Sequence, residues 1–103
     1  MKIAYSRLAL FDLKNIYEFI LKDSFQYARK EVKSIRTVIE QLKSQPNIGK
    51  PFEFRKELLI RELVFKHYRI IYEITPEQIR ILSIHHSSRS LQNNPIANDF
   101  DID

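Results

Sequence analysis

The sequence contains no cysteine, so the chain forms neither disulfide bonds nor thiolate metal sites and has no cysteine nucleophile. It has a single glycine, which excludes the glycine-rich loops that cradle phosphate groups. No Ser-His-Asp order typical of a catalytic triad stands out. The lack of cysteine indicates a reducing compartment, and no residue pattern calls for a cofactor.

Long apolar runs are also missing. No stretch approaches the roughly 18 apolar residues that indicate a membrane span, and the start MKIAYSRLALFDLK lacks the long apolar core of a signal peptide. We therefore expect a cytoplasmic protein that makes no membrane contact.

Acidic residues are scarce in the body of the chain. Seventeen Lys and Arg stand against thirteen Asp and Glu, which gives a net charge of +4. Three of those acids lie within the last five residues, so the other ten leave the body at about +7. A basic body suits a polyanionic partner, either nucleic acid or an acidic protein surface, although an incidental positive balance fits the composition equally well.

The length of 103 residues fits one domain, which we place at residues 1–90. Residues 91–103 contain the segment NNPIANDFDID, with a proline and three aspartates and no apolar alternation. This composition predicts a C-terminal tail outside the fold.

Two amphipathic helices follow a short alternating run, KIAYS, which we interpret as a strand. Ser6 is placed to cap the first helix, which ends near Lys22. Asp23 followed by Gln26 forms a capping-box pattern for the second helix. Its apolar stripe keeps the helical step over four turns and consists of Ala28, Val32, Ile35, Ile39 and Leu42.

The chain then changes from helical to alternating periodicity. SQPNIGKPFEF is predicted as a loop, and residues 58–65, 67–74 and 78–86 are predicted as strands because they alternate and are rich in β-branched and aromatic residues. Pro76 favours a tight turn between the last two strands. The order β-α-α-β-β-β predicts an α+β fold, an antiparallel sheet with both helices on one face.

Alternation assigns the charged side chains of the strands to faces. Tyr68, Ile70 and Tyr72 are expected to face the helices, which directs Arg69 to the opposite, open face. Arg61 shares the helix-facing side with apolar residues, so it requires an anionic or carbonyl partner. We expect an ion pair with an acid of the first helix, such as Asp12 or Glu18, as the structural alternative to target binding by Arg61.

The last predicted strand ends in HHSSR, where His85 and His86 point to opposite faces and Arg89 follows in a loop. Histidines beside arginines serve nucleases, because imidazole transfers protons while guanidinium holds a phosphate oxygen. They also simply end strands. A metal site is not expected, since adjacent strand histidines diverge and only His67 remains to complete a ligand set.

Taken in order, DLKNIYEFI, LKSQPNIGKP, RELVFKHYRIIYEI and IRILSIHHSSR resemble the RelE/ParE superfamily of type II toxin–antitoxin toxins. The resemblance covers Lys2 to Arg89. It implies a growth-inhibiting toxin, of the kind linked to plasmid stabilisation, that is covered by a cognate antitoxin protein. It also implies that operator DNA is contacted only through that antitoxin.

The resemblance leaves two targets. RelE-like members are ribosome-dependent mRNA endoribonucleases, for which Arg69, His86 and Arg89 would be the catalytic set. ParE-like members bind DNA gyrase, for which Arg61, Arg69, His85, His86 and Arg89 are the candidate target-binding residues. Ile60 and Glu62 stand where ribonucleases place lysines, which favours the ParE side. A non-toxic module that only binds an antitoxin is a third alternative.

Overall fold

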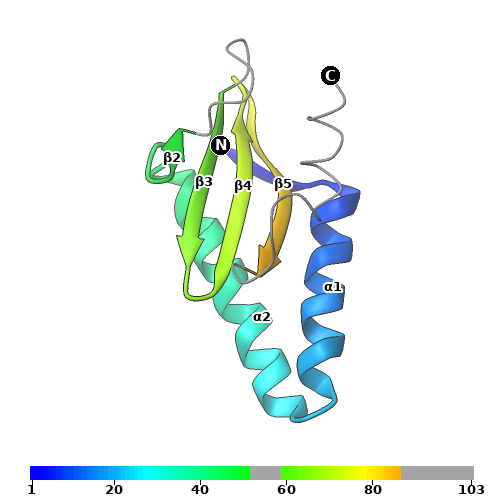
Figure 1. Ribbon diagram of the computed structural model, residues 1–103. Helices are drawn as coiled ribbons and strands as arrows, with labels where there is room; N and C mark the ends of the chain where they lie inside the picture. The colour runs from blue at the N-terminus through cyan, green and yellow to red at the C-terminus, as the bar shows by residue number, and fades with distance from the viewer. Residues whose placement is uncertain (52–58, 87–103) are drawn as a thin grey trace.

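The computed structural model describes residues 1–51 and 59–86 (Figure 1). Strand β1 (Lys2–Tyr5) leads into helices α1 (Arg7–Leu21) and α2 (Phe25–Glu40), and a 3-10 turn, η1 (Gln41–Lys43), continues the second helix. The remaining strands are β2 (Lys50–Pro51), β3 (Ile60–Phe65), β4 (Tyr68–Ile74) and β5 (Gln78–His86). The predicted α+β class and element order are confirmed, with β2 as a short addition.

The strands form one sheet in the order β1-β5-β4-β3-β2. Strands β3 to β5 pair antiparallel, as predicted; β2, in a segment predicted as a loop, pairs antiparallel with β3, and β1 pairs parallel with β5. The parallel pair arises because the two helices return the chain across the sheet before the hairpins begin. The sheet is therefore mixed at this edge.

Serine side chains begin both helices. Ser6 Oγ accepts from the N–H of Ala9 at 3.0 Å, which confirms the predicted cap of α1. The cap of α2 is Ser24, whose Oγ accepts from Tyr27 N at 3.1 Å, and not the predicted Asp23. The connection between the helices is so short that Asp23 still belongs to the end of α1, where its N–H donates to the carbonyl of Ile20.

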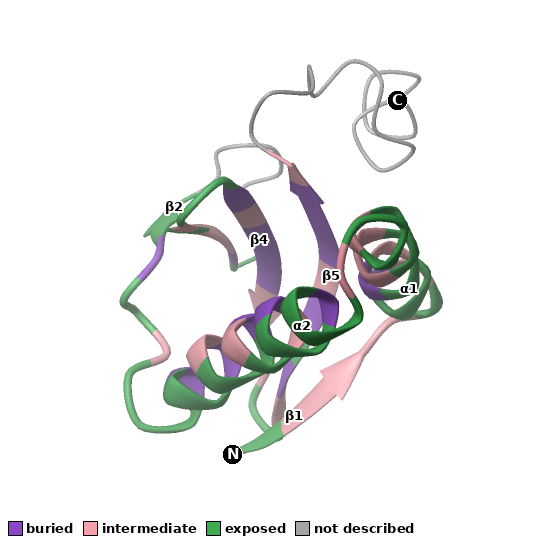
Figure 2. Ribbon diagram, turned by 90° about the horizontal axis from the view of Figure 1, so that it is seen from below, coloured by how far each residue is buried: buried purple, intermediate pink, exposed green. Residues whose placement is uncertain are grey.

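Both helices pack on one face of the sheet, and buried positions of α2, β4 and β5 lie between these layers (Figure 2). The core contains Tyr68, Ile70 and Tyr72 of β4, so the predicted face of that strand is confirmed. The helices contribute buried residues that include Ala9, Leu13, Ile35, Ile39 and Leu42. The apolar stripes read from the sequence thus face the sheet.

A β-bulge interrupts the pairing of β4 with β5. Ile71 pairs with Ser83, but Tyr72 pairs with Ile81, so Leu82 is an extra residue. The bulge changes which residues of β5 face the helices, and both Ile81 and Ile84 lie in the core. Helix α1 stabilises it, because Ser6 Oγ donates to the Leu82 carbonyl and Asp12 Oδ2 accepts from Ile84 N, both at 2.9 Å.

Within the described residues, no helix is long and apolar enough to cross a membrane.

Candidate functional site

Arg69 is the second residue of β4 and lies on the face opposite the helices, as predicted. It pairs with Val64 of β3 on one side and with His85 of β5 on the other. Its side chain is 38% exposed, which confirms the expected partial access to solvent. The candidate site is therefore centred on this residue and its cross-strand neighbours.

Glu62 neutralises the Arg69 guanidinium. Both carboxylate oxygens of Glu62 lie 3.1 Å from Nη1 of Arg69, and the Glu62 side chain is only 13% exposed. A second ion pair on the same face joins Glu73 to Arg80 at 3.2 Å. Each of these two strand arginines thus has a carboxylate partner among the described residues.

The face around Arg69 is less open than alternation suggested. Ile60, Ile71, Ser83 and His85 all point to this side of the sheet, and each is buried, with His85 only 6% exposed. The prediction of an open sheet is therefore wrong for its middle. The buried His85 can contact a target only if the residues that cover it move. Arg69 and Val64, which is 56% exposed, are accessible in the described structure.

His86 projects to the other side of the sheet from Arg69. Its ring packs edge-on against Tyr68, with centroids 5.6 Å apart, and stacks on His67 at 5.7 Å. Arg69 is instead opposite His85 in the register. The structure therefore brings Arg69 together with His85 and separates it from His86, which was its proposed catalytic partner.

A buried carboxylate beneath this histidine pair was missed by the sequence reasoning. Glu31 of α2 is 4% exposed, and it accepts from Lys66 Nζ at 3.0 Å and from the hydroxyls of Tyr27 and Tyr68 at 3.4 Å. Burial, followed by the charge of Glu31, raises the pKa of Tyr68 to about 12. An acid inside the apolar stripe of the second helix was the signal that could have identified it.

Arg61 has carbonyl partners. Its Nη1 donates to the backbone oxygens of Gly49 at 2.6 Å and Asn47 at 3.3 Å. The expected ion pair with Asp12 or Glu18 is wrong, because Arg61 lies beside the loop that precedes β2, and Asp12 binds the backbone of β5. In this position Arg61 fastens the loop to the sheet.

The sequence from residue 3 to residue 91 matches a family described as the ParE toxin of the type II toxin–antitoxin system parDE. The chain belongs to the ParE toxin family. It is thus a type II toxin of the ParE/RelE superfamily, and the match spans both helices and the described sheet except Lys2.

Solved structures share the ParE toxin fold. The chromosomal ParDE system of P. aeruginosa superposes with a TM-score of 0.72 at 23% identity, covering 84% of this chain and 95% of that one. The RelBE2 toxin–antitoxin complex of Mycobacterium tuberculosis gives 0.55 at 23% identity, covering 82% and 95%. The YoeB dimer of Staphylococcus aureus gives 0.51 at 22% identity, covering 84% and 95%. No curated protein sequence matches this toxin.

Two further predictions concern residues at the end of the ParE toxin chain. Arg89 and the tail at residues 91–103 lie outside the described residues, so their predicted roles stay predictions.

In residues 1–51 and 59–86, no group of three or more His, Cys, Asp or Glu side chains is arranged to hold a metal ion.

Proposed function

We propose that this toxin inhibits growth by binding DNA gyrase and that a cognate antitoxin neutralises it. The observation that carries the proposal is the contact of both Glu62 oxygens with Arg69 at 3.1 Å. A ribonuclease needs a guanidinium that is free to hold a scissile phosphate. A protein-binding surface tolerates an arginine that is already paired, because complementary charges and apolar neighbours such as Val64 both contribute to protein interfaces.

The neighbours of Arg69 also disfavour RNA cleavage. Ile60 is buried and Glu62 is acidic at the positions where RelE-like enzymes carry lysines, and an acid there repels a phosphate backbone. Proton transfer requires an acid or base within hydrogen-bond reach of the reacting oxygen. His86 lies on the opposite side of the sheet from Arg69, so the two do not converge on one phosphate.

An antitoxin partner is proposed from family membership and from the solved relatives. The P. aeruginosa structure is a ParDE toxin–antitoxin system, and the M. tuberculosis structure is a toxin–antitoxin complex. By analogy, an antitoxin would cover this toxin and would carry any contact with operator DNA. The simplest genetic check is whether a short gene for such a partner lies directly upstream or downstream of the toxin gene.

The decisive experiment runs two assays on the same purified toxin. In the first, gyrase supercoils relaxed plasmid with increasing toxin; in the second, ribosomes and mRNA are incubated with toxin and the RNA is sized. We expect supercoiling to fall and mRNA to stay intact. Arg89→Ala should weaken gyrase inhibition by roughly tenfold, the effect of losing one interface contact of about 1–2 kcal/mol.

Lys14→Gln is the matched control, because Lys14 is a 71%-exposed cation of α1, the helix that packs on the opposite face of the sheet from Arg69. It should leave inhibition unchanged. Codon-specific mRNA fragments that appear with wild-type toxin and vanish with Arg69→Ala would give the function to the ribonuclease alternative. Glu62→Gln provides a second test of the ribonuclease alternative. If the Arg69 guanidinium acts on phosphate, its release from Glu62 should increase mRNA cleavage.

A further inference from the structure

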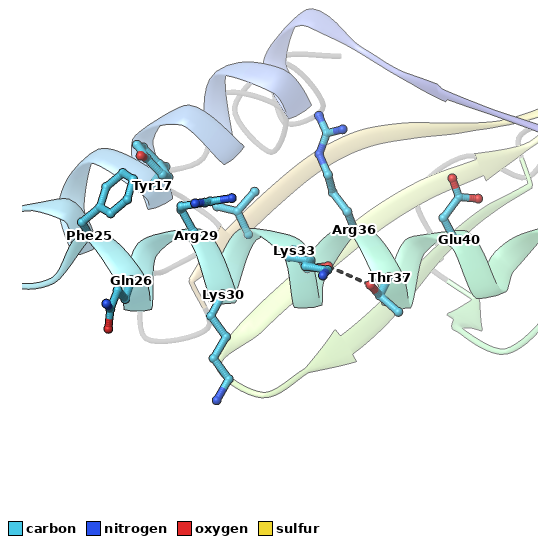
Figure 3. Close-up of a pocket in the computed structure, with 10 residues that line it drawn as sticks. Tyr17, Phe25, Gln26, Arg29, Lys30, Lys33, Arg36, Thr37 and Glu40 are labelled. Atoms are coloured by element: carbon cyan, nitrogen blue, oxygen red, sulfur yellow. Dashed lines mark hydrogen bonds between the residues drawn. The ribbon is translucent and has the colours of Figure 1, made fainter.

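A groove with a volume of about 730 Å³ runs along α2 on the side that faces away from the sheet (Figure 3). Tyr17 of α1 and residues from Phe25 to Glu40 of α2 line it. The fully buried residues of α2, including Ala28, Ile35 and Ile39, do not line the groove. The groove is therefore a second surface, in the helical layer and separate from the strand face that carries Arg69.

Four cations line the groove. Figure 3 shows Lys33 between Arg29 and Arg36 along α2, and Lys30 also lines the groove. Within the described part of the chain, none of these four side chains forms an ion pair. Among the described residues that line the groove, Glu40 is the one acid, and it pairs with Lys43 at 2.8 Å.

Aromatic rings hold two of the guanidinium groups in place. Arg29 lies over the ring of Phe25, 5.7 Å from its centroid, and Arg36 lies over Tyr5 at 5.1 Å. Such contacts restrict the side chain while leaving its N–H groups free to bind an anion. Phe25 is also 54% exposed, so the groove offers apolar area beside its charges.

We propose that this groove binds an acidic amphipathic helix of a protein partner. Arg29, Lys33 and Arg36 recur at steps of four and three residues, so they span about 10 Å along one side of α2. Carboxylates spaced by the same steps on a second helix have the same rise and can face each cation in turn. Val32 and Tyr17 provide contacts for the apolar side of that helix.

A nucleic acid fits the groove less well. Single-stranded nucleic acids combine phosphate contacts with stacking of bases on exposed rings. Here Arg29 already covers one face of the Phe25 ring and Arg36 one face of the Tyr5 ring, which leaves less ring surface for a base. The inference does not depend on gyrase being the target, because it concerns a different surface of the toxin.

The test uses the full-length toxin labelled with 15N and three probes. The first is a synthetic alanine–leucine helix with glutamates at alternating steps of four and three residues, and the second is the same peptide with glutamine in place of each glutamate. The third is a single-stranded RNA with the same net charge as the glutamate peptide. Binding is followed by amide chemical shifts and fluorescence anisotropy in about 0.15 M salt, where screening removes distant charge effects. We expect the glutamate peptide to bind and to shift amides of α2 between Phe25 and Glu40.

The triple variant Arg29→Gln, Lys33→Gln, Arg36→Gln should lose about tenfold or more in affinity for the glutamate peptide. The matched control removes three exposed cations elsewhere, at Lys2, Arg7 and Lys14, and should stay within about twofold of wild type. Equal losses in both variants, or no binding of the glutamate peptide, would overturn the proposal. Tighter binding of the RNA than of the peptide would assign the groove to nucleic acid instead.

Discussion

Asp12 of α1 accepts a hydrogen bond from the backbone N–H of Ile84 at 2.9 Å, across 72 residues of sequence. The bulge at Leu82 disturbs the ladder between β4 and β5, and Asp12 supplies an acceptor beside it. The strand end that carries His85 and His86 is thereby fastened to the first helix. Two of the candidate target-binding residues thus depend on a contact that lies outside the sheet.

Asp12→Ala should destabilise the fold, because it removes the charged acceptor of the Ile84 N–H. We expect a loss of about 1–3 kcal/mol in the free energy of unfolding, measured by urea denaturation followed by circular dichroism. Glu18→Ala is the control, since Glu18 is an exposed acid on the same helix with a weak pair to Lys14 at 3.8 Å. Equal stability of the two variants would show that Asp12 does not hold the bulge.

Lys66 and Glu31 should show energetic coupling. Lys66→Met leaves the buried Glu31 carboxylate without its cation, so we expect a loss of about 1–3 kcal/mol in unfolding free energy. Glu31→Gln should lower the unfolding free energy by less than Lys66→Met does, because the amide oxygen of Gln still accepts hydrogen bonds from the hydroxyls of Tyr27 and Tyr68. A double-mutant cycle over both positions measures the pair directly, and strictly additive effects would contradict the predicted coupling.

Gly49 is required by close packing. A Cβ at this position would lie 2.8 Å from the carbonyl oxygen of Glu62 and 2.8 Å from the hydroxyl of Tyr72. Gly49→Ala should therefore displace the loop and break the bond from Gly49 N to Tyr72, at a cost of about 1–3 kcal/mol. Ser44→Ala in the exposed turn before it is the control. A melting temperature unchanged by Gly49→Ala would be inconsistent with this packing.

Stability should fall at high pH because of Tyr68. Its pKa is raised from 10.0 to about 12, so the folded state keeps a proton that the unfolded chain releases. The corresponding stabilisation is complete below about pH 10 and is lost as the pH rises toward 12. We expect the free energy of unfolding to decrease over this window, and less steeply in Tyr68→Phe, when urea unfolding is measured at intervals of pH. If the unfolding free energy of wild type and of Tyr68→Phe fell with pH at the same slope, Tyr68 would be excluded as the source of the pH dependence.

Local sequence determined the elements and much of their orientation. Ala28, Ile35 and Ile39 recur at helical steps over enough turns to define one buried side of α2. Ser6, directly before α1, carries the side-chain oxygen that caps this helix. Alternation in β4 likewise placed Arg69 opposite the helices, because neighbouring strand residues must point to opposite faces. These features depend on residues only a few positions apart, so the sequence alone contains them.

Tertiary structure decided which side chains meet. Glu62 reaches Arg69 because of the register between β3 and β4, and the bulge at Leu82 sets which histidine shares the face of Arg69. The position of Glu31 in the apolar stripe of α2 is visible in the sequence, but its cation, Lys66, is 35 residues away and reaches it only when the turn after β3 packs against α2. Such pairings are set by loop paths and strand register, which sum many weak contacts between distant segments. No local sequence pattern encodes these pairings, and the pairing of β3 with β4 determines whether Arg69 is free or neutralised by Glu62.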